Sequence, residues 1–159
     1  MGWGHFTGGD FPSAIGCFQH ASQASADPYY SQFPRLGLVY SYVANGQFEE
    51  AEGPLREVLD LSEKFDTQIV KTPAKALLGL ISIAKGNLSQ GIKKFEDVQQ
   101  ILIETERKSL YAASEYMLGR VYSKIRQGGK EIRLSVIIKN ISFLLRNFPF
   151  ATMKAEEHF

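Results

Sequence analysis

The chain has 159 residues, of which 44% are apolar, and it is therefore long enough to bury the core of one domain. Its single cysteine, Cys17, excludes an internal disulfide and a cysteine-based zinc site and favours a reducing, cytoplasmic setting. No apolar run reaches the roughly 18 residues of a membrane-spanning helix, so we expect no membrane span.

The charged residues are distributed unevenly, although the formal net charge is only +1. Residues 1–70 contain three Lys/Arg and nine Asp/Glu, a balance of −6. Residues 120–147 contain seven Lys/Arg and one Asp/Glu, a balance of +6. We therefore expect an electrically polar molecule with an acidic first half and a basic region near its C-terminus.

The first recognisable motif is TGGDF at residues 7–11. GGDF lacks one acidic residue of GGDEF, a signature of enzymes that condense two nucleotides. Such a site also needs a second acidic residue in a strand-turn-strand context, whereas a helical pattern follows here, with Phe11, Ala14 and Phe18 on one face. We interpret Gly9 and its neighbours as a turn between two helices.

A longer pattern recurs every forty residues. LVYSYVANGQFEEAEGPLREVL at 38–59 aligns with LGLISIAKGNLSQGIKKFEDVQ at 78–99 and with LGRVYSKIRQGG at 118–129, and the first column of all three is leucine. A fixed period of this length predicts a series of stacked structural repeats.

Within each repeat the apolar residues have helical spacing. A glycine, Gly46 or Gly86, follows the first apolar stripe and predicts the end of one helix. A second stripe then begins, and its small residue, Ala51 or Gly91, would let the two helices approach closely. Each repeat therefore predicts a pair of antiparallel helices.

The expected elements follow in chain order from this pattern. After a helix that ends near Thr7, we expect helices at 11–25, 29–45, 48–65, 73–86, 88–104 and 108–127. They group into repeat units near residues 1–25, 29–65, 73–104 and 108–128. Pro28 and Pro73 lie near predicted helix starts, where the missing backbone N–H costs little.

Over residues 1–128 these columns resemble the tetratricopeptide repeat (TPR), in which Leu-Gly-x-x-Tyr in a first helix precedes Gly-Asp/Asn-Phe/Tyr-x-x-Ala-x-x-x-Phe. The resemblance implies an all-α fold, a right-handed α-α superhelix (TPR-like solenoid) of stacked antiparallel helix pairs. The chain departs from the pattern at Val39, Ser82 and Arg126. Its forty-residue period exceeds the roughly thirty-four residues of the common repeat, which predicts helices lengthened by about one turn.

Residues 130–148 do not fit the repeat and predict an extra, inserted apolar helix near the C-terminus. Apolar side chains occupy two opposite faces of this segment, which favours packing between two partners. An exposed docking helix and a membrane-surface helix are the alternatives. Residues 150–159 read as the start of a truncated further repeat helix, so we expect the chain to be a fragment of a longer protein.

Three stretches resemble the C-terminal TPR region of multidomain bacterial proteins in which a class III adenylate or guanylate cyclase domain and an AAA-type ATPase domain precede the repeats. They are ALLGLISIAKGNLSQG, SEYMLGRVY and KNISFLLRNFPFATMKAEEHF. The resemblance implies a regulatory or sensing part of a signalling protein. The catalytic domain would lie outside this chain.

No combination of residues predicts catalysis by the chain itself. His5, His20 and His158 are far apart in the sequence, and there is no nucleophile elbow and no phosphate-binding loop. We therefore expect neither an enzyme nor a bound metal or cofactor.

The first helix of each unit is expected to line an inner, concave groove. Inward-facing positions give this groove aromatic and aliphatic walls and a basic end. The groove candidates are Trp3, Phe6, Phe33, Tyr40, Leu80, Ile83, Tyr116, Arg120 and Lys124. Some of them, especially Leu80 and Ile83, fit a packed core equally well. A groove of this kind would accept an apolar helix or an extended peptide, with its basic end meeting a carboxylate.

Three functions remain open at this point. The first is a protein-protein interaction module for a protein or peptide ligand of unknown identity. The second is a structural scaffold that self-associates through exposed repeat ends. The third is nucleic-acid binding through the basic residues 120–147. The acidic first half and the absence of interleaved aromatic residues argue against the third, so we expect no nucleic-acid partner.

Overall fold

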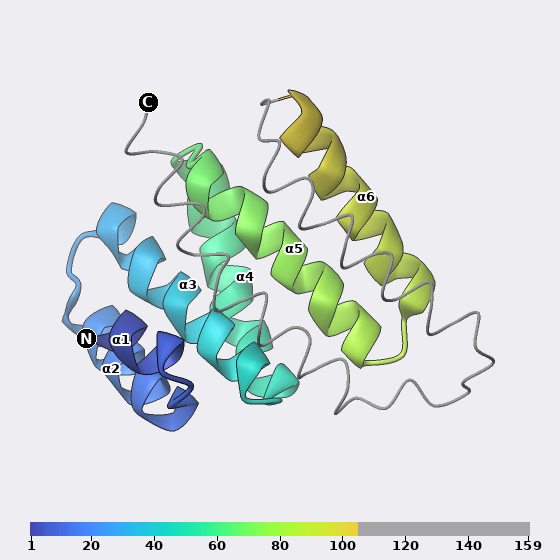
Figure 1. Ribbon diagram of the computed structural model, residues 1–159. Helices are drawn as coiled ribbons and strands as arrows, with labels where there is room; N and C mark the ends of the chain where they lie inside the picture. The colour runs from blue at the N-terminus through green and yellow to red at the C-terminus, as the bar shows by residue number, and fades with distance from the viewer. Residues whose placement is uncertain (105–159) are drawn as a thin grey trace.

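The structure is a computed structural model that describes residues 1–104. These residues form six α-helices that pack in contact with one another (Figure 1). No strand occurs among these residues, so the expected all-α class is confirmed for this part of the chain. The helices are α1 (Gly2–Thr7), α2 (Phe11–Ala24), α3 (Pro28–Ala44), α4 (Phe48–Lys64), α5 (Gln68–Ala84) and α6 (Leu88–Glu104). The predictions for 108–128, 130–148 and 150–159 lie outside the described residues.

The lengths of the helices account for the forty-residue period. Helices α3, α4, α5 and α6 each contain 17 residues. The connections between successive helices all contain three residues. Two helices and two connections therefore make up one period.

The turns inside the helix pairs contain glycine where a left-handed backbone is required. Gly9, Gly46 and Gly86 have φ angles of 82°, 78° and 89°, a region that a residue with a Cβ enters at a cost of about 1–2 kcal/mol. The amide of Gly46 donates to the carbonyl of Val43, and the next amide donates to the carbonyl of Tyr42. The same two bonds recur at the other two turns and close each helix end, as predicted for Gly46 and Gly86.

The connection between α4 and α5 uses an aspartate for the same purpose. Asp66 has a φ of 50° and donates its amide to the carbonyl of Glu63 at 3.3 Å. Aspartate tolerates this conformation better than most residues that carry a Cβ. Because the turn is complete at Thr67, α5 begins at Gln68, five residues before the predicted start at residue 73.

The prediction that Pro73 lies near a helix start was therefore wrong, since it lies inside α5. Pro34 and Pro54 lie inside α3 and α4 in the same way. A proline there removes one bond, to the carbonyl four residues earlier, and the surrounding turns hold the helix together. Pro28, in contrast, stands at the first position of α3, as expected.

The GGDF motif forms the predicted turn between α1 and α2. Asp10 is the N-cap of α2, and its carboxylate accepts a hydrogen bond from the backbone amide of Ser13 at 3.2 Å. Gly9 supplies the left-handed turn, and Phe11 begins the helix. The acidic residue of this motif therefore has a capping role.

This cap predicts a measurable titration. The hydrogen bonds with Ser13 hold the pKa of the Asp10 carboxyl below its ordinary value of 3.8. The stability that the cap contributes is therefore present above the ordinary pKa and is lost as the pH falls through the lowered one. Carboxyl-detected NMR titration of the parent, with Asp10→Asn as a non-titrating cap, should show this lowered pKa. A pKa at or above the ordinary value would contradict the capping role.

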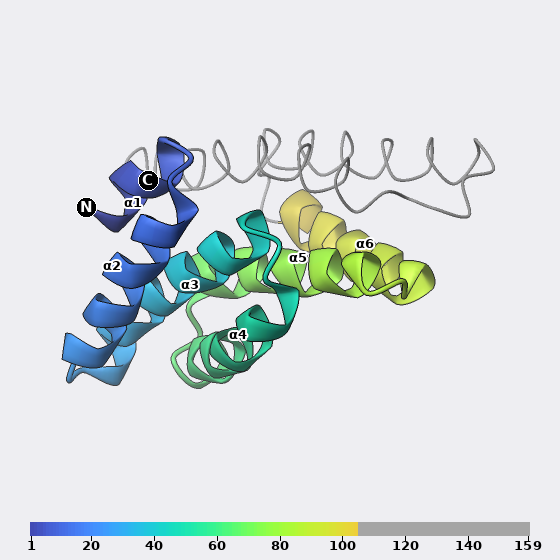
Figure 2. The same ribbon diagram turned by 90° about the horizontal axis from the view of Figure 1, so that it is seen from below.

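Successive helices pack against each other, and the first helices of neighbouring pairs also meet. Helix α3 contacts both α1 and α5, whereas within residues 1–104 no contact joins α2 with α4 or α4 with α6. Helices α5 and α6 lie side by side in both views (Figure 1, Figure 2). The first helix of each new pair therefore contacts both helices of the preceding pair, and the second helix of the new pair contacts neither.

Small residues set the spacing within the third pair, as the sequence predicted. A Cβ built on Gly91 would lie 2.4 Å from Cγ1 of Ile83 and 2.8 Å from the carbonyl oxygen of Gly79. Real Cβ atoms do not approach other atoms this closely. Helices α5 and α6 therefore touch backbone to backbone at the two glycines.

Candidate functional site

Most of the described groove candidates lie in the interior. Phe6, Tyr40, Leu80 and Ile83 are all at most 4% exposed. Trp3 and Phe33 are half-buried and pack against the core. Of the two interpretations open for Leu80 and Ile83, their burial supports the core. Tyr116, Arg120 and Lys124 lie outside the described residues.

The aromatic candidates near the N-terminus form one packed cluster. The ring of Trp3 meets the rings of Phe6 and Tyr40 edge-on, with centroids 5.7 and 5.9 Å apart, and Phe18 lies 5.0 Å away on another side. Burial raises the pKa of the Tyr40 phenol well above its ordinary value, because the charged form would lose its hydration. These rings join α1, α2 and α3 and thereby serve as core residues.

A second aromatic group lies at the surface, and we call it the aromatic patch. It consists of Tyr29, Tyr30, Phe33 and Phe65. The Tyr29 ring is its centre, with edge-on partners at 5.2 Å (Tyr30), 6.0 Å (Phe33) and 5.6 Å (Phe65). The exposed fraction is 63% for Tyr30, 38% for Tyr29 and 36% for Phe65.

Two helix ends bring these rings together. Asp27 caps α3 by accepting from the amide of Tyr29 at 2.9 Å, which fixes both tyrosines in the first turn. Phe65 follows the last residue of α4, and the left-handed turn at Asp66 reverses the chain directly after it. The ammonium of Lys64 lies 5.4 Å from the centre of the Phe65 ring. The cap at the start of α3 and the turn after α4 therefore fix the backbone positions of the patch residues.

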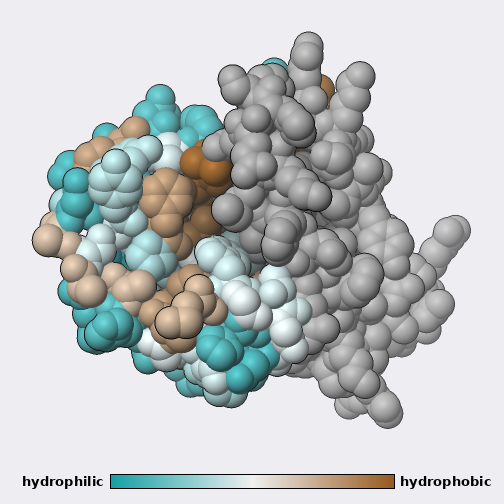
Figure 3. All heavy atoms as spheres, turned by 60° about the vertical axis from the view of Figure 1, so that its left-hand side comes forward, coloured by the Kyte–Doolittle hydropathy of each residue, from teal (hydrophilic) through white to brown (hydrophobic). Residues whose placement is uncertain are grey.

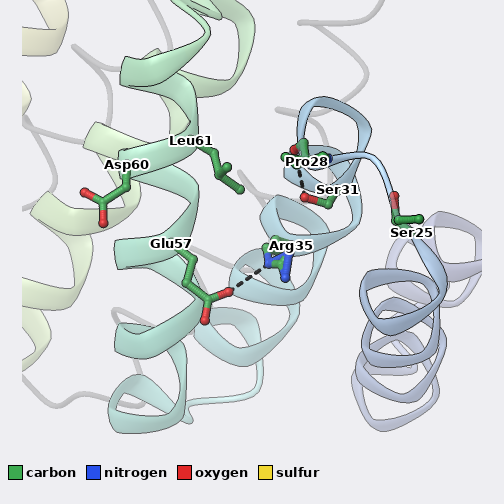
Figure 4. A pocket seen from close by; sticks show the side chains of 8 residues that line it. Ser25, Pro28, Ser31, Arg35, Glu57, Asp60 and Leu61 are labelled. Atoms are coloured by element: carbon green, nitrogen blue, oxygen red, sulfur yellow. Dashed lines mark hydrogen bonds and ion pairs between the residues drawn. The ribbon is translucent and has the colours of Figure 1, made fainter.

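A pocket of about 420 Å³ lies on the surface where the α2–α3 connection, α3 and α4 meet (Figure 4). Its lining residues are Ser25, Ala26, Pro28, Ser31, Arg35, Glu57, Asp60 and Leu61. Arg35 and Glu57 point toward one another across it, and Nε of Arg35 donates to Oε2 of Glu57 at 2.8 Å. Among the described residues, Nη1 of Arg35 is buried and has no hydrogen-bond partner.

The outer surface carries apolar and polar residues side by side. On the face shown in Figure 3, brown and teal residues alternate, and the most apolar ones gather near the centre of the view.

Within the described part, no group of three His, Cys, Asp or Glu side chains is arranged to hold a metal ion. Among residues 1–104, no helix has both the length and the apolar character needed to cross a bilayer.

The sequence pattern predicted one patch residue, Phe33, and none of the pocket residues. The pair Tyr29–Tyr30 directly after Asp-Pro was a usable signal, because it places two large rings in the exposed first turn of a helix. The pocket had no such signal. Arg35 and Glu57 are 22 residues apart, and only the packing of α3 against α4 brings them together.

The chain was compared with protein-family models, curated proteins and solved structures, and none of them matches it.

Proposed function

We propose that this chain is a non-catalytic protein-protein interaction module and that its partner docks on the aromatic patch. The observation that carries this proposal is the group of four touching rings, of which three are more than one-third exposed. Exposed aromatic clusters mark interaction sites in soluble proteins, and tyrosine is enriched among the residues that dominate binding energy.

The arrangement of the rings suits recognition. Tyr29 touches three other rings, so its orientation is set before a partner arrives and little side-chain entropy is lost on binding. Tyr30 offers a large ring together with a hydroxyl group that can hydrogen-bond at the edge of an interface. The matching partner surface is a helix or an extended peptide with apolar side chains.

The forty-residue repeat extends this proposal from the aromatic patch to a longer binding groove. Stacking of such helix pairs in one direction makes a TPR-like superhelix, whose first helices line a groove. Phe33 belongs both to the predicted groove and to the aromatic patch, so the patch would form one end of that groove. By the resemblance given above, the module would be the regulatory or sensing part of a larger cytoplasmic signalling protein.

A paired substitution tests the proposal. Tyr30→Ser with Phe65→Ser removes two exposed rings, whereas Gln23→Ser with Glu96→Ser changes two exposed polar residues elsewhere. After circular dichroism shows that both variants fold, each is used with the parent to recover proteins from a lysate of the source cell. We expect a protein that the parent and the control retain and that the patch variant loses at least about tenfold, as for loss of a hot spot.

Two outcomes would contradict the proposal. The first is recovery of the same proteins by all three forms. The second is recovery of the chain itself alone, together with a molar mass by light scattering that rises with concentration in all three forms. That result would support a scaffold that self-associates independently of the patch.

A further inference from the structure

Charged side chains border the aromatic patch at both helix ends, and the two signs are not balanced. At the start of α3, Asp27 stands three residues before Tyr30. At the end of α4, Lys64 and Asp66 stand on either side of Phe65. All three charged side chains are exposed. A partner that docks on the patch therefore meets two carboxylates and one ammonium group, an excess of negative charge.

The ammonium group is already placed against an aromatic ring. Nζ of Lys64 lies 5.4 Å from the centre of the Phe65 ring, within the range of a cation–π contact. Tyr30 has no such cation among the described residues and is 63% exposed. Its ring meets Tyr29 edge-on, at an interplanar angle of 86°, so at least one face of the Tyr30 ring is free of Tyr29. That face can receive a second cation.

Both carboxylates have an oxygen to offer to a partner. Oδ1 of Asp27 accepts from the amide of Tyr29 at 2.9 Å, and Oδ1 of Asp66 accepts from Nε2 of Gln68 at 3.2 Å. Within residues 1–104, Oδ2 of each carboxylate has no hydrogen-bond partner. Asp27 is the N-cap of α3 and Tyr30 is its third helical residue, so this free oxygen and the exposed ring are neighbours in one turn.

An arginine side chain matches an exposed ring beside a carboxylate. Its planar guanidinium stacks on an aromatic face and donates to a carboxylate at the same time. An anionic side chain at this place would be repelled by the two carboxylates. Resting on the function proposed above, we propose that the partner segment carries an arginine between aliphatic residues. The guanidinium lies on the Tyr30 ring and donates to Asp27, and Asp66 adds to the attraction.

Three peptide probes test this inference on the full chain. They are N-acetyl-Leu-Arg-Leu-amide and the same peptide with citrulline or glutamate in place of the arginine. Citrulline keeps the planar shape of the arginine side chain and removes its charge. The readout is the shift of the Tyr30 ring signals in a ¹³C NMR titration. We expect the arginine peptide to bind with a Kd about fivefold or more below that of the citrulline peptide, and the glutamate peptide to bind most weakly.

A double variant removes the two charges and keeps the backbone. In Asp27→Asn the helix cap remains, because asparagine caps a helix as well as aspartate does. In Asp66→Asn the left-handed turn remains, because asparagine also tolerates that conformation. We expect the double variant to bind the citrulline peptide as the parent does, with its preference for arginine reduced below about twofold. The control, Glu96→Gln with Asp97→Asn, removes two exposed carboxylates on α6 and should keep the full preference.

Four results would overturn the inference. They are equal binding of the arginine and citrulline peptides, tightest binding of the glutamate peptide, an arginine preference that persists in the double variant, and no shift with any probe. Self-association of the parent that Tyr30→Ser abolishes would also overturn it, because a second copy would then cover the patch.

Failure of the arginine and failure of the aromatic patch give different results. If Tyr30→Ser weakens the arginine and citrulline peptides equally, the partner is apolar and the patch remains a binding surface. Recovery of proteins from the lysate uses no peptide probe. Retention of the same proteins by the parent and by the patch variant would therefore count against the patch itself, whichever peptide binds best.

Discussion

Gly91→Ala is expected to lower the free energy of unfolding by about 1–3 kcal/mol, the cost typical of overpacking a core. The new methyl group would lie 2.8 Å from the carbonyl oxygen of Gly79 and 3.1 Å from the backbone nitrogen of Ile83. Because these are backbone atoms, α5 and α6 would have to separate to relieve the contact. Urea unfolding followed by circular dichroism gives the measurement.

Gly16→Ala is the matched control for this change. Gly16 lies in the interior of α2, and a Cβ built there meets nothing within 4 Å. The substitution should raise the free energy of unfolding by about 0.5–1 kcal/mol, because alanine loses less backbone entropy in a helix than glycine. If both variants were stabilised, the close approach of α5 and α6 would be wrong.

Leu77→Ala is expected to cost about 2–5 kcal/mol, as other deletions of buried leucine do. Leu77 lies in α5, the helix that joins the second and third pairs, and it is 1% exposed. Loss of this side chain would leave a cavity in the core, and the packed helices around it would fill that cavity only in part. Ile103→Ala, at a position that is 54% exposed, should cost less than about 1 kcal/mol in the same urea titration. Equal losses would contradict the assigned core.

The turns inside the helix pairs were predictable because their chemistry is local. Gly46 and Gly86 stand where the backbone must turn left-handed, and few other residues do so without cost. The start of α5 was not predictable from the same rule. Asp66 makes the equivalent turn without a glycine, and Pro73 suggested a helix start although it lies inside the helix.

The candidate site was harder to predict than the fold. Helical spacing identifies which residues of a helix share a face, but neighbouring helices decide whether that face is core or groove. Tyr40 and Phe33 lie on the same helix, yet the first is buried by Trp3 and Phe6 whereas the second borders an exposed cluster. The exposure of Phe33 and the burial of Tyr40 depend on which other helices pack against α3, and the spacing of residues within α3 does not show this.

Site-specific photo-crosslinking is the decisive measurement for the proposed binding surface. A benzophenone side chain is introduced at Tyr30 in the aromatic patch, and in a second preparation at His20, an exposed position on α2. After irradiation in a lysate of the source cell, we expect a crosslinked protein of defined mass from position 30 and not from position 20. The same products from both positions, or none from position 30, would contradict a partner on the aromatic patch.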